Sequence, residues 1–105
     1  MFMATSVWSE VVYLDCDAIE VKKGITNTSL AVDTEARLVK VGGAEVGYTE
    51  YGNRIEFQEM SSSLHRHYSL DRVAGTLQEL SFDKGTNGKL RLIMNYKCTR
   101  TDPLF

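Results

Sequence analysis

The segment LRLIMNYKCT, residues 90–99, alternates between apolar and mainly polar side chains with a period of two. Its apolar positions are Leu90, Leu92, Met94, Tyr96 and Cys98. Successive side chains of a β-strand point to opposite faces of the sheet. The segment therefore predicts an antiparallel strand with one face in an apolar core and the other in water.

The same period recurs along the chain, and short turn signals interrupt it. Near the start, Val12, Leu14 and Cys16 form an apolar face. Turns are expected where charged residues, glycine or asparagine gather, at residues 22–24, 33–36, 42–43, 51–53 and 84–88. The expected fold is all-β, a single-domain antiparallel meander that forms a closed or nearly closed barrel of about eight strands. A β-sandwich is the alternative.

The alternation of apolar residues changes parity between residues 77 and 80. Leu77 lies at an odd-numbered position, whereas the next apolar residues, Leu80 and Phe82, lie at even-numbered positions. A β-bulge inserts one extra residue and so reverses the parity that follows. We therefore expect a bulge or bend near Gln78 and Glu79 that returns Leu80 and Phe82 to the core.

The composition is that of an ordinary globular domain. The chain has 105 residues, of which 43% are hydrophobic and 25% are charged. Its net charge of -2 lacks the basic excess that phosphate backbones attract, so no nucleic-acid partner is expected. No run approaches the roughly 20 apolar residues of a membrane helix, so no membrane span is expected.

We expect the chain to divide into a flexible N-terminal arm (residues 1–10), a β-barrel domain (residues 11–100) and a C-terminal tail (residues 101–105). The arm lacks the basic and apolar regions of an intact signal peptide. Two locations stay open: the cytoplasm, or the periplasm or extracellular space if a signal peptide has been removed.

The two cysteines, Cys16 and Cys98, both fall on the apolar faces of their strands. No C-x-x-C motif accompanies them, so a structural zinc site is not expected. They form either a disulfide or two buried thiols. A disulfide would close a long loop and contribute roughly 4 kcal/mol to stability by the chain-entropy model.

Three short patches carry a resemblance. The first cysteine lies in YLDCD (residues 13–17), a D-R-x-x-G-x-L pattern occupies residues 71–77, and a Y-x-C pattern occupies residues 96–98. With meandering strands between them, these patches resemble a group of small bacterial β-barrel proteins of uncharacterised function, many of them exported. The resemblance covers most of residues 11–99. It implies a small antiparallel barrel and export, and it implies no particular activity.

One candidate metal site lies on residues 64–71. His65 and His67 point to the same side of a strand, so their imidazoles would be able to share a transition-metal ion. A third ligand would come from Asp71 on the same face or from Glu56 on a neighbouring strand. The polar neighbours of the same parity, Ser69 and Asp71, favour two solvated histidines instead.

A candidate ligand site involves Tyr48, Tyr68 and Tyr96, which fall on inferred apolar faces. Side chains fill most of a small barrel, but some eight-stranded barrels hold one small ligand. The three tyrosines either pack in the core or line a cup in one mouth. On the arm, Phe2 and Trp8 would be able to contact a partner or a second copy of the chain.

No catalytic residue and no cofactor is predicted. Asp15 and Asp17 share one face of a strand, but the dense oxygen ligands of a calcium loop are missing around them. Nucleophile-elbow and phosphate-loop motifs are also absent from the sequence.

The leading hypothesis is therefore a non-enzymatic binding or interaction module. Its partner would be an unidentified protein or small molecule, and a homodimer is one form of that hypothesis. One alternative is a small-ligand carrier with a pocket in the barrel mouth. The other is a metal-binding protein that uses His65 and His67.

Overall fold

The fold is taken from a computed structural model, which describes residues 11–22, 25–61, 63–84 and 88–101. These ranges contain eight strands: β1 (Val11–Lys22), β2 (Ile25–Asp33), β3 (Leu38–Val41), β4 (Ala44–Tyr51), β5 (Arg54–Met60), β6 (Leu64–Asp71), β7 (Thr76–Asp83) and β8 (Leu90–Thr101). In the same ranges no helix is long and apolar enough to cross a membrane. The predicted arm, nearly all of the predicted tail, and parts of the turns at residues 22–24 and 84–88 lie outside the described residues.

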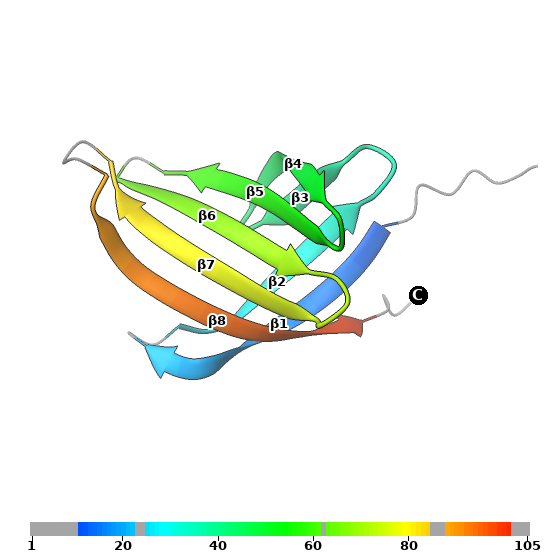
Figure 1. Ribbon diagram of the computed structural model, residues 1–105, viewed down its shortest axis with the longest axis horizontal. Helices are drawn as coiled ribbons and strands as arrows, with labels where there is room; N and C mark the ends of the chain where they lie inside the picture. The colour runs from blue at the N-terminus through cyan, green and yellow to red at the C-terminus, as the bar shows by residue number, and fades with distance from the viewer. Residues whose placement is uncertain (1–10, 23–24, 62, 85–87, 102–105) are drawn as a thin grey trace, which may run out of the picture.

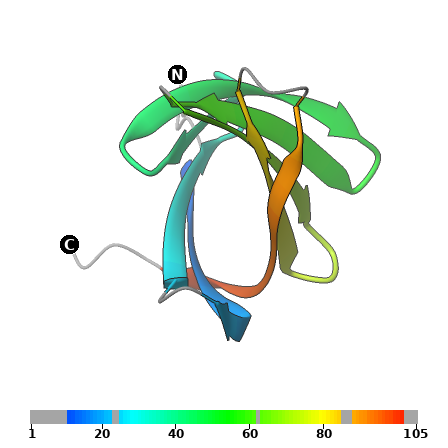
Figure 2. The ribbon, with the colours of Figure 1, turned by 90° about the vertical axis from the view of Figure 1, so that its left-hand side faces the viewer.

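The strands form one closed antiparallel barrel. Each strand pairs with the next along the chain, and β8 pairs with β1 to close the sheet. Figure 1 shows the strands running between two mouths, and Figure 2 shows the barrel from one of them. The predicted all-β meander barrel is confirmed, and the sandwich alternative is wrong.

The barrel interior contains the apolar parity of the strands. The predicted face of β8 is confirmed, because Met94, Tyr96 and Cys98 are buried. Leu90, at the start of that strand, remains 44% exposed. The core cluster draws residues from seven strands: Cys16, Leu30, Val32, Val39, Val41, Ile55, Phe57, Tyr68, Leu70, Leu77, Met94, Tyr96 and Cys98.

The predicted bulge near Gln78 and Glu79 is wrong. Strand β7 pairs with β6 without a break, and its pairing with β8 becomes irregular only between Ser81 and Phe82. Consequently Glu79 and Ser81 are the buried residues of this stretch, whereas Leu80 and Phe82 are only partly buried. The barrel accepts a carboxylate inside because other interior side chains bind it, as described below.

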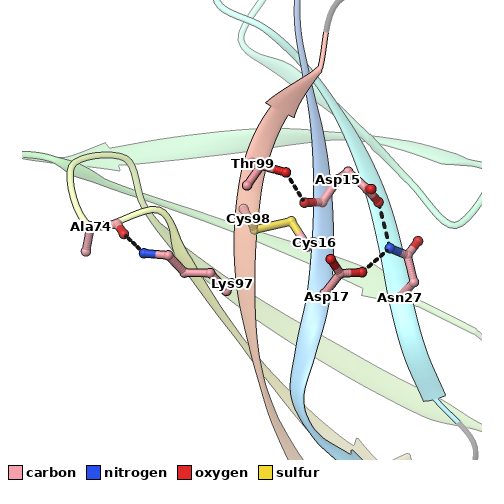
Figure 3. Close-up of a disulfide and its surroundings, with 8 residues drawn as sticks. All are labelled: Asp15, Cys16, Asp17, Asn27, Ala74, Lys97, Cys98 and Thr99. Carbon is pink, nitrogen blue, oxygen red and sulfur yellow. Dashed lines mark hydrogen bonds between the residues drawn. A yellow bond between two sulfur atoms is a disulfide. The ribbon is translucent and has the colours of Figure 1, made fainter.

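A disulfide joins the first and last strands. Cys16 and Cys98 lie directly opposite each other in the β1–β8 pair, and their sulfur atoms are 2.08 Å apart (Figure 3). The bridge crosses the seam at which the barrel closes and links residues 82 positions apart. Of the two states left open by the sequence, the structure contains the disulfide.

Candidate ligand-binding site

The two mouths of the barrel have different interiors. At one mouth, on the right in Figure 1, β1 begins, β8 ends, and turns at residues 34–37, 52–53 and 72–75 connect the strands. We call it the cup mouth. At the other, β1 ends, β8 begins and the tight turn at residues 42–43 joins β3 to β4. We call it the charged mouth, after the interior side chains near it.

A cavity of about 280 Å³ opens at the cup mouth, and we call this cavity the cup. Its apolar wall consists of Val12, Leu14, Val32 and Leu70, together with Cys98 of the disulfide. Val32, Leu70 and Cys98 also belong to the buried core cluster. The cup is therefore an open continuation of the hydrophobic core.

Asp71 stands at the rim of the cup and organises the turn that follows β6. Its Oδ1 accepts hydrogen bonds from the backbone N–H groups of Val73 at 3.0 Å and Ala74 at 2.9 Å. These two bonds stabilise the carboxylate and lower the pKa of Asp71 below its usual value. The aspartate that begins the D-R-x-x-G-x-L pattern is thus a turn-forming residue.

Arg72 ties the same turn to the next one around the rim. Its guanidinium donates to the carbonyl oxygens of Gly52 at 2.7 Å and Asn53 at 3.3 Å. The third bond goes to Glu50, whose Oε2 lies 3.1 Å from Nη1 of Arg72. The arginine of the pattern therefore connects two turns of the cup mouth.

Gly75 allows this turn to approach β8 beside the disulfide. Its φ is +70°, a conformation that side chains disfavour, and a Cβ at this position would lie 3.2 Å from the carbonyl oxygen of Cys98. The N–H of Cys98 donates to the Gly75 carbonyl at 2.7 Å. Nearby, Lys97 donates from Nζ to the carbonyl of Ala74 (Figure 3). The turn is held against the seam of the barrel.

The polar groups around the cup already have partners within the protein. Asp71 and Arg72 make the bonds described above, and Thr34 and Arg100, the other polar residues of the rim, also have interactions within the protein. A ligand would therefore meet an apolar wall and a rim whose polar residues already interact with the protein. This arrangement suits an apolar group better than one that needs several hydrogen bonds.

The interior near the charged mouth contains an ionic network centred on Glu79. The Glu79 side chain is only 8% exposed, and its Oε2 lies 3.4 Å from Nε of Arg66. Tyr96 donates its hydroxyl hydrogen to Oε1 of Glu79 at 2.9 Å, and Ser81 donates to Oε2 at 3.3 Å. Every carboxylate oxygen of this buried glutamate is thus hydrogen-bonded or ion-paired, which offsets the cost of its burial.

Arg66 extends this network to a second carboxylate. Its Nη1 lies 3.5 Å from Oε1 of Glu59, which also accepts a hydrogen bond from the hydroxyl of Tyr68 at 3.3 Å. Burial and the nearby Glu79 raise the pKa of Tyr68. Burial and the hydrogen bond to Glu79 raise the pKa of Tyr96 in the same way. Both tyrosines therefore stay protonated and act as donors to the carboxylates.

The structure places the three predicted ligand-binding tyrosines away from the cup. Tyr68 and Tyr96 belong to the ionic network, and the Tyr68 ring stacks on Phe57 with centroids 5.0 Å apart. Tyr48 is partly buried and packs against the core from β4. None of the three lines the cavity at the cup mouth.

The two predicted metal ligands lie on the outer face of β6. Nε2 of His65 is 2.7 Å from Oε1 of Gln58, and Nε2 of His67 is 3.6 Å from Oε1 of Glu56. The other candidate ligand, Asp71, forms the turn at the far end of the strand. Among the described residues, no three histidine, cysteine or acidic side chains are grouped to hold a metal ion.

Asp15 and Asp17 share a single polar partner on the outer surface. Nδ2 of Asn27 donates to Oδ1 of Asp15 at 2.6 Å and to Oδ1 of Asp17 at 2.8 Å (Figure 3). This agrees with the outer-face interpretation of the two aspartates. Their hydrogen bonds hold β1 to β2.

Sequence reasoning missed Glu59, Arg66 and Glu79. One signal was present, because Arg66 shares the parity of the apolar residues Leu64, Tyr68 and Leu70 on its strand. An arginine at a core position requires a buried acidic partner. A search for that partner on the adjacent strands would have found the two glutamates.

The fold and the cup define a small, disulfide-bridged, closed antiparallel barrel with an apolar cavity at one mouth. When the chain is compared with known proteins, no family model matches it, and neither a curated protein nor a solved structure does.

Proposed function

We propose that this protein is a non-enzymatic binding module that takes up a small apolar ligand in the cup. The observation that carries the proposal is the apolar cavity of about 280 Å³ at the cup mouth. This volume lies just below the usual range of ligand pockets, roughly 300–1,000 Å³. An apolar cavity of about 150 Å³ is already large enough to bind benzene.

The distribution of polar groups supports an apolar ligand. The interior carboxylates Glu59 and Glu79 lie in the half of the barrel near the charged mouth, and Arg66 pairs with both. At the cup mouth, Asp71 and Arg72 are used to build turns. This separation leaves the cup with hydrophobic contact as its main source of binding free energy.

The proposal includes export to an oxidising compartment, either the periplasm or the extracellular space. Disulfides persist in such compartments and are rare in the cytosol. The bridge between Cys16 and Cys98 supports this part of the proposal, because it is a structural disulfide within the core of the barrel. Titration of free thiols in protein taken directly from cells, under denaturing conditions, tests this part. Export predicts that this titration finds no free thiol.

The test of the ligand site is a titration of the full chain with toluene, a small apolar probe. We expect saturable shifts in the amide NMR signals of Val12, Leu14, Val32 and Leu70, and a rise in thermal midpoint with probe concentration. Shifts confined to the outer face of the barrel, or shifts that never saturate, would reject the cup as the site.

Two matched variants separate the cup from the rest of the surface. Val12→Phe fills the cup from its wall, whereas Val11→Phe makes the same change at the neighbouring residue, which lines a separate groove of about 220 Å³ on the outer face of the barrel. We expect toluene binding to be lost in Val12→Phe and kept in Val11→Phe. Equal binding by both variants contradicts the proposal.

A further inference from the structure

We infer that the protein docks on the surface of an anionic lipid bilayer through an apolar patch on the outer face of strands β5–β8, next to the charged mouth. We call this surface the outer patch, and it consists of Met60, Leu80, Phe82, Leu90 and Ile93. The patch lies near the mouth opposite the cup, so this inference does not depend on the proposed function.

The registers of four strands bring the outer patch together. Residues directly opposite each other on adjacent strands share one face of a sheet. Two neighbouring rows of opposed residues cross the strands from β5 to β8, and they are Met60–His65–Phe82–Leu90 and Gln58–His67–Leu80–Ile93. Because Glu79 and Ser81 are buried in the barrel, the alternate residues of β7, Leu80 and Phe82, belong to the outer face.

The outer patch is accessible to a partner. Met60, Leu90 and Ile93 are 61%, 44% and 39% exposed, and Leu80 and Phe82 are partly buried between them. Single exposed apolar side chains are common on proteins, but a contiguous group of them marks an interaction site. The two central strands of the patch, β6 and β7, each pair with a neighbour on both sides. A partner therefore meets side chains here and cannot add a strand.

The charge beside the outer patch indicates a negatively charged partner. Asp83 and Arg91 form an ion pair at 2.9 Å, so their charges largely cancel. Lys84 and Lys89 are both exposed, and Lys84 donates from Nζ only to a neutral group, the carbonyl of Ser61, among the described residues. The chain as a whole has a net charge of -2, so this basic edge is a local feature. Anionic headgroups attract lysines that lie close to the membrane surface.

The position of the patch favours a bilayer. The β5–β6 and β7–β8 connections meet at the charged mouth, where the N–H of Lys84 donates to the carbonyl of Ser63 at 3.1 Å (Figures 1 and 2). Met60 ends β5 and Leu90 begins β8, so both lie beside these connections with the two lysines. A hollow of about 290 Å³ adjoins the patch and is lined by Leu90, Arg91, Leu92 and Ile93. Lipid chains and headgroups adapt to such an uneven surface, and interfacial binding needs only apolar contact beside cations.

The first test uses the unmodified full-length protein with its disulfide intact, in co-sedimentation with large unilamellar vesicles. We expect binding to vesicles of equal parts phosphatidylglycerol and phosphatidylcholine, and at least about tenfold weaker binding to phosphatidylcholine alone. Added salt should release the protein, because it screens the lysines from the headgroups. Absence of binding to the anionic vesicles, or equal binding to both compositions, overturns the inference.

Two matched double variants test the apolar contact. Met60→Ser with Leu90→Ser removes two exposed side chains of the outer patch, whereas Tyr51→Ser with Val73→Ser removes two side chains, 55% and 75% exposed, near the cup mouth. We expect the first pair to weaken binding to the anionic vesicles by about tenfold and the second pair to leave it unchanged. Equal affinities of the two double variants contradict the inference.

A second pair of double variants separates the basic edge from the net charge of the chain. Lys84→Gln with Lys89→Gln should weaken binding to the anionic vesicles by about tenfold or more. Lys40→Gln with Lys97→Gln changes the net charge equally, and Lys97, like Lys84, donates from Nζ to a backbone carbonyl. This control should bind nearly as well as the unmodified protein. An equal loss in both double variants would mean that no local site exists.

Sedimentation equilibrium without vesicles distinguishes a second copy of the chain from a membrane. Docking on lipid predicts a monomer whose mass is independent of protein concentration. A dimer that Met60→Ser with Leu90→Ser dissociates would assign the outer patch to a second copy and overturn the inference.

Discussion

Replacement of Arg66 by methionine tests whether the ionic network stabilises the barrel. Methionine replaces the unbranched aliphatic stem of arginine with a similar apolar chain but lacks the guanidinium, which pairs with both Glu59 and Glu79. The variant leaves two interior carboxylates with only hydroxyl donors for partners. We expect a large loss of stability at neutral pH, because an uncompensated buried charge is costly.

The burial of the three side chains sets the magnitude. Breaking a fully buried ion pair costs about 3–5 kcal/mol, whereas an exposed pair contributes about 0–1 kcal/mol. The Glu79 side chain is 8% exposed and that of Glu59 is 15% exposed, but that of Arg66 is 31% exposed. Solvent therefore screens part of the interaction, and we expect a loss of about 2–3 kcal/mol at pH 7.

The pH dependence identifies the cause. Without Arg66, a proton taken up by an interior glutamate removes the uncompensated charge. The destabilisation should therefore be smaller at acidic pH than at pH 7. A loss of packing alone would persist at every pH.

The assay is urea unfolding followed by circular dichroism at pH 7 and pH 4.5, with the disulfide intact in all samples. Arg91→Met is the matched control, because the Arg91 side chain is 53% exposed and pairs with Asp83 at 2.9 Å on the surface. It should cost less than about 1 kcal/mol at either pH. If Arg66→Met costs no more than Arg91→Met, or costs the same at both pH values, the reasoning is refuted.

Three more outcomes follow from the fold. Replacing Cys16 and Cys98 together by alanine should lower the free energy of unfolding by about 4 kcal/mol, since the bridge links residues 82 positions apart; urea midpoints that match those of the bridged protein would contradict this. Burial raises the pKa of Tyr96, so the contribution of its protonated hydroxyl to stability is complete below about pH 10 and is lost as the pH rises further. Between pH 9 and pH 11, the free energy of unfolding measured in urea should therefore fall by about 1 kcal/mol less in Tyr96→Phe than in the unmodified protein. Gly75→Ala should destabilise the barrel by about 1–2 kcal/mol because of the positive φ, and by a further amount because the added Cβ would press on the Cys98 carbonyl. Gly88→Ala, also at positive φ but in open space, should show only the cost of the positive φ. Thermal unfolding of the two variants measures the difference.

The alternation of residues 90–99 was sufficient to predict the most buried part of β8, because a strand with one face in a core must repeat every two residues. The same rule failed at β7. It assigned Leu80 and Phe82 to the core by hydrophobicity and invoked a bulge to place them there. The strand instead keeps its register and turns Glu79 inward, where Arg66 and Tyr96 stabilise it. A polar residue at a core position can be interpreted only together with partners on other strands, which periodicity does not reveal.

The candidate site shows the same limit. Val12 and Leu14 were predicted as core residues from parity, and they do face inward. Whether inward-facing side chains fill the space or leave a cavity depends on how the turns around residues 34–37 and 72–75 close the mouth, which parity does not reveal. The resemblance drew attention to residues 71–77, and the bonds of Asp71, Arg72 and Gly75 give that pattern a structural role.

The pairing of β1 with β8 also determines where the described chain leaves the barrel. Tyr13 lies opposite Thr101, so both ends emerge side by side at the cup mouth. A short linker between them would make a circular chain, which could be reopened at the β3–β4 turn with every strand pair retained. In such a permutant, Cys16 and Cys98 would become near neighbours along the chain. The same bond would then link two strands of one hairpin instead of the first and last elements of the fold.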